Sequence, residues 1–154
     1  MAKQTRFIPK FPEKYMGDPR RIVSRSSWEL AYMSALDNSR MVTKWMSEPR
    51  NLKITYLDPL TKKVKTYWPD FLIQYADGNI EIVEVKPLKE ASLNKAVSQY
   101  DKLMLVKNIA KWQSAEQFAK KIGARFRVVT EQQMFGNKST KSPRPPKAAR
   151  RVVK

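Results

Sequence analysis

The 154-residue chain contains no cysteine and no histidine, and each absence narrows its chemistry. Without cysteine the chain can form no disulfide framework, no zinc finger and no dithiol redox pair. Without histidine as well, most of the hydrolytic chemistries that proteins use are excluded.

Long apolar segments are also missing. No run approaches the ~18 apolar residues of a membrane span, and the first residues lack the apolar core of a secretion signal. No internal repeat is visible. Hydrophobic residues still make up 42% of the chain. We therefore expect a single domain with a packed core and no contact with a membrane.

Acidic residues are scarce, with 14 Asp and Glu against 31 Lys and Arg, which gives a formal net charge of +17. The excess lies mainly at the two ends. Residues 1–25 carry seven Lys or Arg and two acids, and residues 137–154 carry seven Lys or Arg and no acid. Basic arms on a compact domain favour a polyanionic partner, most often nucleic acid. The alternative is that the arms only aid solubility.

These features divide the chain into three parts. Residues 1–25, interrupted by three prolines, should form a basic arm that lies on the domain. Residues 26–136 should form the domain itself. Residues 137–154 are rich in Ser, Pro, Lys and Arg, and we expect them to be a disordered basic tail.

Within the domain, capping and alternation patterns predict the elements. The predicted helices run from Ser26 or Ser27 to about Asp37, from about Ala91 to Val106, and from Ser114 to just before Gly123. The predicted strands are residues 52–57, 63–67, 70–75, 80–86 and 125–130, the first four of them paired as two hairpins. This order indicates an α/β (α+β) fold in which helices flank a mixed sheet.

The second hairpin, residues 69–87, holds the most informative side chains. Glu84 and Lys86 share one strand face with Ile80 and Ile82, a face that should be largely buried. Asp70 begins the partner strand, and a turn centred on residues 77–78 places it opposite residue 85 or 86. The turn thus brings two carboxylates and one lysine together.

Two carboxylates this close would repel each other unless a cation lay between them. A hard divalent ion such as Mg²⁺ binds oxygen ligands of this kind, lowers the pKa of a bound water and neutralises charge on a phosphate. The hairpin therefore predicts metal-dependent phosphodiester hydrolysis. The alternative is an ordinary hairpin in which Glu84 and Lys86 form a salt bridge on a solvated face.

These residues also resemble a known group of enzymes. Pro69-Asp70 and Glu84-Val85-Lys86, with a helical Glu29 upstream, are similar to the PD-(D/E)xK nuclease superfamily. Within it, the chain most resembles the head-completion nucleases of tailed phages and, more distantly, the TnsA-type transposon endonucleases. The shared motifs are Gly17-Asp18-Pro19, Arg25-Ser26-Ser27-Trp28-Glu29, Ser47-Glu48, Glu84-Val85-Lys86-Pro87, Lys111-Trp112 and the strand from Phe126 to Glu131.

The resemblance implies a restriction-endonuclease-like core and roles for individual residues. Asp70, Glu84 and the backbone carbonyl of Val85 would bind Mg²⁺ or Mn²⁺, and Lys86 would assist the nucleophile. Glu29 would complete the acidic cluster directly or through water, although a helix cap explains it equally well. Glu48 would be a further support residue, or only part of a loop.

Cations around this site are candidates for DNA contacts. Six residues lie in the arm or the first hairpin: Arg20, Arg21, Arg25, Lys62, Lys63 and Lys65. They offer point charges without base-reading geometry, so we expect phosphate contacts and little sequence specificity. Trp45, Trp68 and Trp112 fit a core or half-buried position better than stacking on bases.

The sequence thus predicts a metal-dependent DNA endonuclease that acts in phage head completion in the host cytoplasm. Its partners would be double-stranded DNA and phage head, portal or neck proteins. One alternative is a non-catalytic basic protein of the virion head or neck. Another is a junction-resolving or transposon-end nuclease of the same fold.

Overall fold

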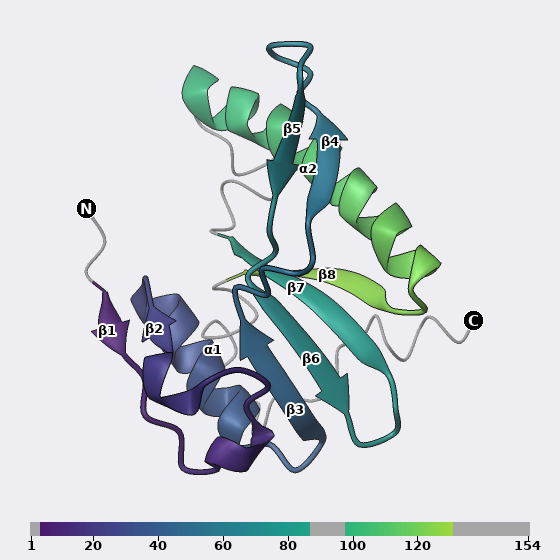
Figure 1. The fold of residues 1–154 in the computed structure, drawn as a ribbon. Coiled ribbons are helices and arrows are strands. Elements are labelled where there is room, and N and C mark those ends of the chain that lie inside the picture. Colours follow the sequence, from purple (N-terminus) through teal and green to yellow (C-terminus); the bar gives the residue numbers. More distant parts are fainter. Residues whose placement is uncertain (1–3, 87–97, 131–154) are drawn as a thin grey trace, which may run out of the picture.

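The structure is a computed structural model that describes residues 4–86 and 98–130 (Figure 1). Its longer elements are the helices α1 (Ser27–Asn38) and α2 (Gln99–Lys121) and six strands. The strands are β3 (Val42–Ser47), β4 (Ile54–Leu57), β5 (Val64–Tyr67), β6 (Phe71–Tyr75), β7 (Ile80–Lys86) and β8 (Arg125–Thr130). The N-terminal segment adds the short strands β1 (Thr5–Arg6) and β2 (Val23–Ser24) and 3-10 turns at Pro12–Lys14 and Pro19–Arg21.

A four-stranded mixed sheet forms the centre, in the order β3-β6-β7-β8. Neighbouring strands are antiparallel except β7 and β8, which are parallel. A parallel pair needs a long crossover, and α2 lies in the segment that provides it. The predicted mixed sheet with flanking helices is confirmed, as are both hairpins and the last strand.

Helix α1 covers one face of this sheet. Ser26 Oγ accepts a hydrogen bond from the Glu29 backbone N–H at 3.1 Å, so the helix begins at the predicted cap. The Glu29 carboxylate reaches back to the Arg25 N–H at 2.9 Å, one residue before the position it takes in a standard capping box. Tyr32, Met33 and Leu36 then pack against buried side chains of the sheet.

Helix α2 covers the other face, and the β4–β5 hairpin packs against α2. Ile82 packs with Leu52, Ala119 and Ala124, whereas its neighbour Val83 packs on the α1 side. Strand β7 is therefore buried on both faces. The side chains of Ile82 and Glu84 lie on the same face of this strand. The β4–β5 hairpin extends beyond the sheet and lies beside α2, as Figure 1 shows. A small core that includes Tyr56, Tyr67 and Ala115 joins the hairpin to the helix.

The prediction of two helices in the region of α2 was wrong. Residues 99–121 form one helix, capped by Ser98, and Ser114 lies inside it. Residues 107–113 contain no glycine or proline, so the helix has no reason to stop before Ser114. It ends as predicted before Gly123, whose φ is +76°. The predicted helical residues 91–97 lie outside the described part.

The N-terminal segment is tied to the end of α1. The buried Asp37 carboxylate accepts hydrogen bonds from the backbone N–H of Lys10 and Phe11 at 2.7 and 3.4 Å. Lys14 Nζ donates to the last carbonyls of the helix, those of Leu36, Asp37 and Ser39. Ile22, fully buried, joins the core under α1.

The predicted tail and residues 131–136 lie outside the described part of the chain. Within the described part, each helix is too short or too polar to cross a membrane.

Candidate active site

Asp70 lies directly before β6, where the antiparallel register with β7 places it opposite Glu84. The register pairs Phe71 with Val83 and Gln74 with Ile80. Five residues lie between that last pair, so the turn centres on Asp77 and not between residues 77 and 78. The predicted partner, residue 85 or 86, was therefore wrong by at least one position. Asp70 Oδ2 accepts a hydrogen bond of 2.8 Å from the Val85 N–H, which fixes the carboxylate against β7.

Glu84 is buried on the same side of β7 as Ile82, with 4% of its surface exposed. Its Oε2 atom lies 3.7 Å from Lys86 Nζ. Its Oε1 atom is buried and has no hydrogen-bond partner among the described residues. The alternative of a salt bridge on a solvated face therefore does not describe this pair. A buried carboxylate oxygen without a donor is costly, which suggests that the site is built for a ligand.

The two carboxylates disturb each other's ionisation. Burial raises the pKa of Asp70 to about 6, against the opposing effect of its hydrogen bond from Val85. Burial, followed by the charge of Asp70, raises the pKa of Glu84 to about 8, and Lys86 and Lys111 oppose this rise. Without a cation, the pair therefore tends to hold a proton near neutral pH. A divalent cation between the carboxylates would remove that tendency.

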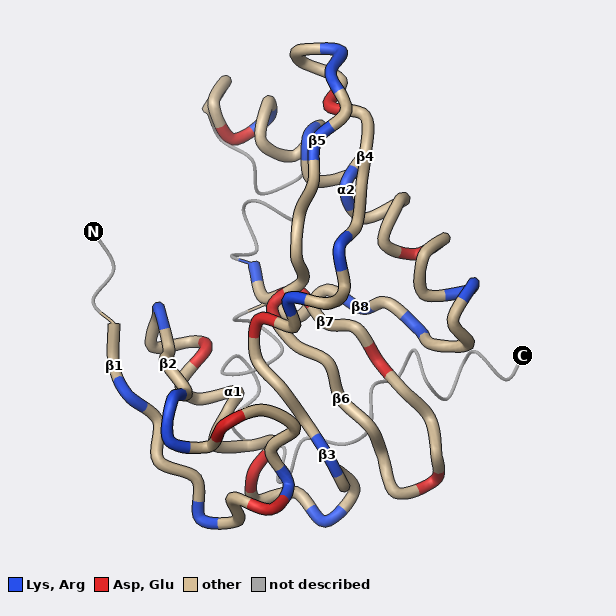
Figure 2. The backbone as a smooth tube through the Cα atoms, viewed as in Figure 1, with Lys and Arg blue, Asp and Glu red and all other residues tan. Residues whose placement is uncertain are grey.

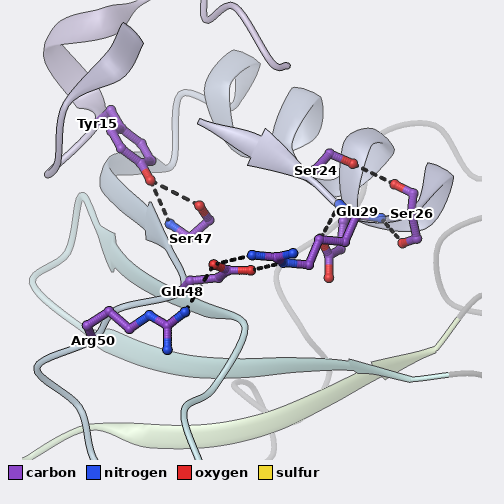
Figure 3. A network of polar contacts seen from close by, with 8 residues as sticks. Tyr15, Ser24, Ser26, Glu29, Ser47, Glu48 and Arg50 are labelled. Atoms are coloured by element: carbon purple, nitrogen blue, oxygen red, sulfur yellow. Dashed lines mark hydrogen bonds and ion pairs between the residues drawn. The ribbon is translucent and has the colours of Figure 1, made fainter. Parts of the chain in front are cut away.

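Two further carboxylates belong to this region, Glu29 in the first turn of α1 and Glu48 directly after β3 (Figure 3). The charges of Glu29 and Glu48 both raise the pKa of Asp70. The Glu48 N–H donates to the Asp70 carbonyl at 2.8 Å, and Glu48 has a φ of 47°, a conformation that non-glycine residues rarely adopt. Glu29 remains engaged as a cap of α1. Across residues 4–86 and 98–130, no three Asp, Glu, His or Cys side chains converge as a metal-binding group.

Arg25 lies next to the acidic residues Glu29, Glu48 and Asp70, which are called the acidic group below. Its guanidinium binds the Glu48 carboxylate through Nε and through Nη2, the latter at 3.3 Å. Arg50 approaches the same carboxylate at 3.9 Å. Figure 2 shows acidic and basic segments side by side where β3 ends and β6 begins, near the base of the β4–β5 hairpin. The negative charge of the site is therefore partly balanced by arginines.

The other predicted DNA contacts lie in two separate places. Arg20 is exposed and paired with Asp18 at 3.2 Å, and Arg21 is exposed beside it. Lys62 and Lys63 are exposed in the turn of the β4–β5 hairpin, whereas Lys65 pairs with Asp58 at 2.9 Å. Among the six, Arg25 is the one that the contacts place at the acidic group.

The tryptophans differ in exposure. Trp45 is fully buried and Trp112 is half-buried, as expected. Trp68 is 36% exposed, with Arg50 over its ring at 5.3 Å. Trp68 is thus available at the surface, against the expectation of a core or half-buried position.

Sequence reasoning missed Tyr67 and Lys111 as neighbours of the site. The Tyr67 hydroxyl is buried, and burial followed by the charges of Glu84 and Asp70 raises its pKa. Lys111 lies on α2, with its Nζ 5.0 Å from the centre of the Tyr67 ring. The Lys111-Trp112 motif pointed to this part of the chain. However, the two helices predicted from the sequence left Lys111 between them, whereas in the structure it lies within the single helix α2.

Comparison with known proteins places this geometry in a family. Residues 39–131 match the TnsA-like endonuclease N-terminal domain. The chain belongs to the TnsA-like endonuclease family. It is also 31% identical over 141 residues to "Head completion nuclease" of Enterobacteria phage T4. The aligned region covers 85% of this chain and 93% of that relative. These similarities confirm the predicted nuclease family and support a nuclease role.

Membership in the TnsA-like family also accounts for the fold. The mixed central sheet with its two described helices is consistent with the predicted restriction-endonuclease-like core. The matched region includes Glu48, Asp70, Glu84 and Lys86, and begins after Glu29.

Proposed function

We propose that this chain is a divalent-metal-dependent DNA endonuclease that acts in phage head completion. The observation that carries the proposal is the pair of carboxylates at Asp70 and Glu84, with Lys86 Nζ 3.7 Å from Glu84 Oε2. Membership in the TnsA-like endonuclease family and the similarity to a phage head completion nuclease support it. A buried carboxylate oxygen without a hydrogen-bond partner, as at Glu84 in the described part of the chain, is costly in a protein that makes no use of it.

The residues present fit a hard cation. Asp70 and Glu84 offer carboxylate oxygens, and the buried Oε1 of Glu84 has no hydrogen-bond partner within residues 4–86 and 98–130. The Val85 N–H points toward Asp70, and the carbonyl of a strand residue points to the same side as its N–H. These donors suit Mg²⁺ or Mn²⁺, which commonly bind through one or two carboxylates and keep several waters. Glu29 would then act through one of those waters.

A bound cation would supply a water of lowered pKa and would neutralise charge on the scissile phosphate. Val85 anchors the Asp70 carboxylate, and the register of β6 and β7 places Glu84 opposite Asp70, so that both carboxylates can serve one cation. Lys86, half-buried beside Glu84, places its ammonium where it can donate to an attacking water or to the phosphate. The burial of Glu84 strengthens the electrostatic interactions of its carboxylate.

The substrate we propose is double-stranded DNA, cut with little sequence specificity. The chain carries a net charge of +17, and the exposed cations named above suit phosphate contacts. The partners would be phage head, portal or neck proteins during assembly in the host cytoplasm, in keeping with the name of the phage relative.

Two other functions remain as outcomes of the test. A non-catalytic virion protein would bind DNA and leave it intact. A junction-resolving or transposon-end nuclease, which the TnsA-like family match favours, would prefer branched DNA or specific ends over linear duplex.

The test is cleavage of plasmid and linear duplex in Mg²⁺ or Mn²⁺ by the wild-type protein, Lys86→Ala and Asp70→Asn. We expect cleavage by the wild type and a loss of at least about a hundredfold in each variant, because each removes a group that stabilises the transition state. Lys120→Ala, an exposed lysine at the end of α2, is the matched control and should cut normally. Intact DNA with normal binding would favour the virion protein, and full activity of Lys86→Ala would remove the assigned site.

We further expect Arg25→Gln to weaken DNA binding several-fold and to reduce the salt dependence of binding by about one phosphate contact. Arg25 is exposed and lies against Glu48 at the edge of the site, where it can reach a phosphate. Arg40→Gln is the control, because this exposed arginine precedes β3 at its opposite end, roughly 20 Å away by strand length. Binding would be measured in Ca²⁺ to prevent cleavage. Equal effects of the two variants would contradict the assignment.

A further inference from the structure

Lys111 is a second cation near the acidic pair, and it comes from α2 and not from the sheet. Its Nζ atom lies 5.0 Å from the ring centre of Tyr67 and 6.0 Å from that of Tyr56. Both tyrosines belong to the β4–β5 hairpin, which packs on α2. The ammonium is thus held against two aromatic faces, and these contacts fix its position.

Its environment differs from that of the neighbouring lysines. Lys107, one helical turn earlier, approaches the buried Asp58 at 3.9 Å, and Lys65 contacts the same carboxylate at 2.9 Å. Lys111 has no carboxylate within the 4.0 Å of an ion pair in the part of the chain that is described. Burial and the charge of Lys86 lower its pKa, and Glu84 is the first of the charges that counter this. A half-buried ammonium is therefore kept near the carboxylates without being neutralised by direct contact.

Tyr67 gives a second, independent indication of a ligand. Its side chain is 7% exposed, and its hydroxyl is buried without a hydrogen-bond partner among the described residues. The charges of Glu84 and Asp70 both act on this hydroxyl. A buried O–H donor without an acceptor needs an explanation, and an oxygen of a bound anion would provide one.

We propose that Lys111 and the Tyr67 hydroxyl bind a non-bridging oxygen of the scissile phosphate, opposite Lys86. This inference rests on the proposed nuclease function and adds a phosphate-binding half to the site. Lys86 lies next to Glu84 on β7 and serves the attacking water, whereas Lys111 approaches from α2. Lys111 transfers no proton in this role, and the charge of its ammonium offsets the negative charge that builds on the phosphate oxygens. The rings of Tyr56 and Tyr67 keep the ammonium in place before DNA arrives.

The experiment compares wild type, Lys111→Gln, Lys111→Arg and Tyr67→Phe in single-turnover cleavage of a linear duplex with Mn²⁺. Affinity for the same duplex is measured separately in Ca²⁺. The matched control is Lys102→Gln, the same charge change at an exposed position of the same helix. Circular dichroism melts verify that each variant is folded.

We expect Lys111→Gln to lower the rate at saturating DNA by about 10- to 1000-fold while changing affinity less than about threefold, since the contact strengthens in the transition state. Lys111→Arg should restore most of the rate, and Tyr67→Phe should cost several-fold. A Lys111→Gln rate within twofold of wild type, or one that Arg fails to restore, would overturn the inference and leave the proposed function standing. A wild-type protein that leaves DNA intact would overturn both. If Lys111→Gln does not fold, Tyr67→Phe decides the outcome: a several-fold loss of rate would support the inference, and a rate within twofold of wild type would overturn it.

Discussion

Glu84→Gln is expected to lower metal-dependent cleavage by at least about a thousandfold and, at the same time, to stabilise the metal-free protein. The loss of activity follows because the amide is a poor ligand for a hard divalent cation and removes the charge that would hold it. The gain in stability follows because Glu84 is only 4% exposed and its Oε1 atom has no hydrogen-bond partner in the described part of the chain. These opposite effects separate a lost function from a lost fold.

The stability effect has a defined pH dependence. Burial and Asp70 raise the pKa of Glu84 from 4.5 to about 8, so the folded protein binds this proton more tightly than the unfolded chain. The free energy of unfolding must then fall as the pH rises from 4.5 to about 8. At pH 8 in EDTA, Glu84→Gln should unfold at a temperature higher by roughly 3 °C or more, which corresponds to about 1 kcal/mol or more. At pH 4 the difference should vanish.

Glu81→Gln provides the matched control on the same strand. Glu81 is equally buried, but it accepts a hydrogen bond of 2.7 Å from Tyr75 and pairs with Arg127 at 3.4 Å. Its replacement removes half of a satisfied buried pair, so it should destabilise the protein and leave cleavage by the folded fraction unchanged. A Glu84→Gln variant that is less stable than wild type at pH 8 would show that this carboxylate has a structural role.

Trp45→Ala is expected to reduce the free energy of unfolding by about 3–5 kcal/mol, a large part of the stability of a domain of this size. Trp45 is fully buried on β3, with its ring centre 4.8 Å from that of Tyr15 and 5.8 Å from that of Phe7. Its carbonyl also accepts a hydrogen bond of 2.9 Å from the Met16 N–H. The residue therefore joins the N-terminal segment to the sheet, and a cavity there would weaken both.

Urea denaturation monitored by circular dichroism measures this effect. The control is Trp68→Ala, which removes a 36% exposed ring and its contact with Arg50 and should cost no more than about 1 kcal/mol. Similar losses for the two variants would mean that Trp45 does not hold the segment and the sheet together.

The elements that the sequence predicted correctly are those whose signals are local. The capping residues of α1, the alternation of β6 and β7 and the turn at Gly78 each lie within a few residues of one another. Strand β3 was missed because its pairing with β6 contains a register shift between Val42 and Lys44, which breaks the alternation of buried and exposed residues. A regular pattern would have identified it.

The candidate site divides in the same way. Asp70, Glu84 and Lys86 lie on one hairpin, so a single turn brings them together, and only the register had to be corrected. Lys111 and Tyr67 approach from α2 and the β4–β5 hairpin, and their positions depend on long-range packing that local patterns do not encode. Arg25 joins Glu48 across 23 positions of the chain for the same reason.

The most direct test of the central claim is an anomalous-scattering map of crystals soaked in Mn²⁺ at a concentration that supports cleavage. We expect a peak between the carboxylates of Asp70 and Glu84, in contact with the Val85 carbonyl, and no such peak in Asp70→Asn. Mn²⁺ bound only elsewhere, or absent from this position at that concentration, would contradict it.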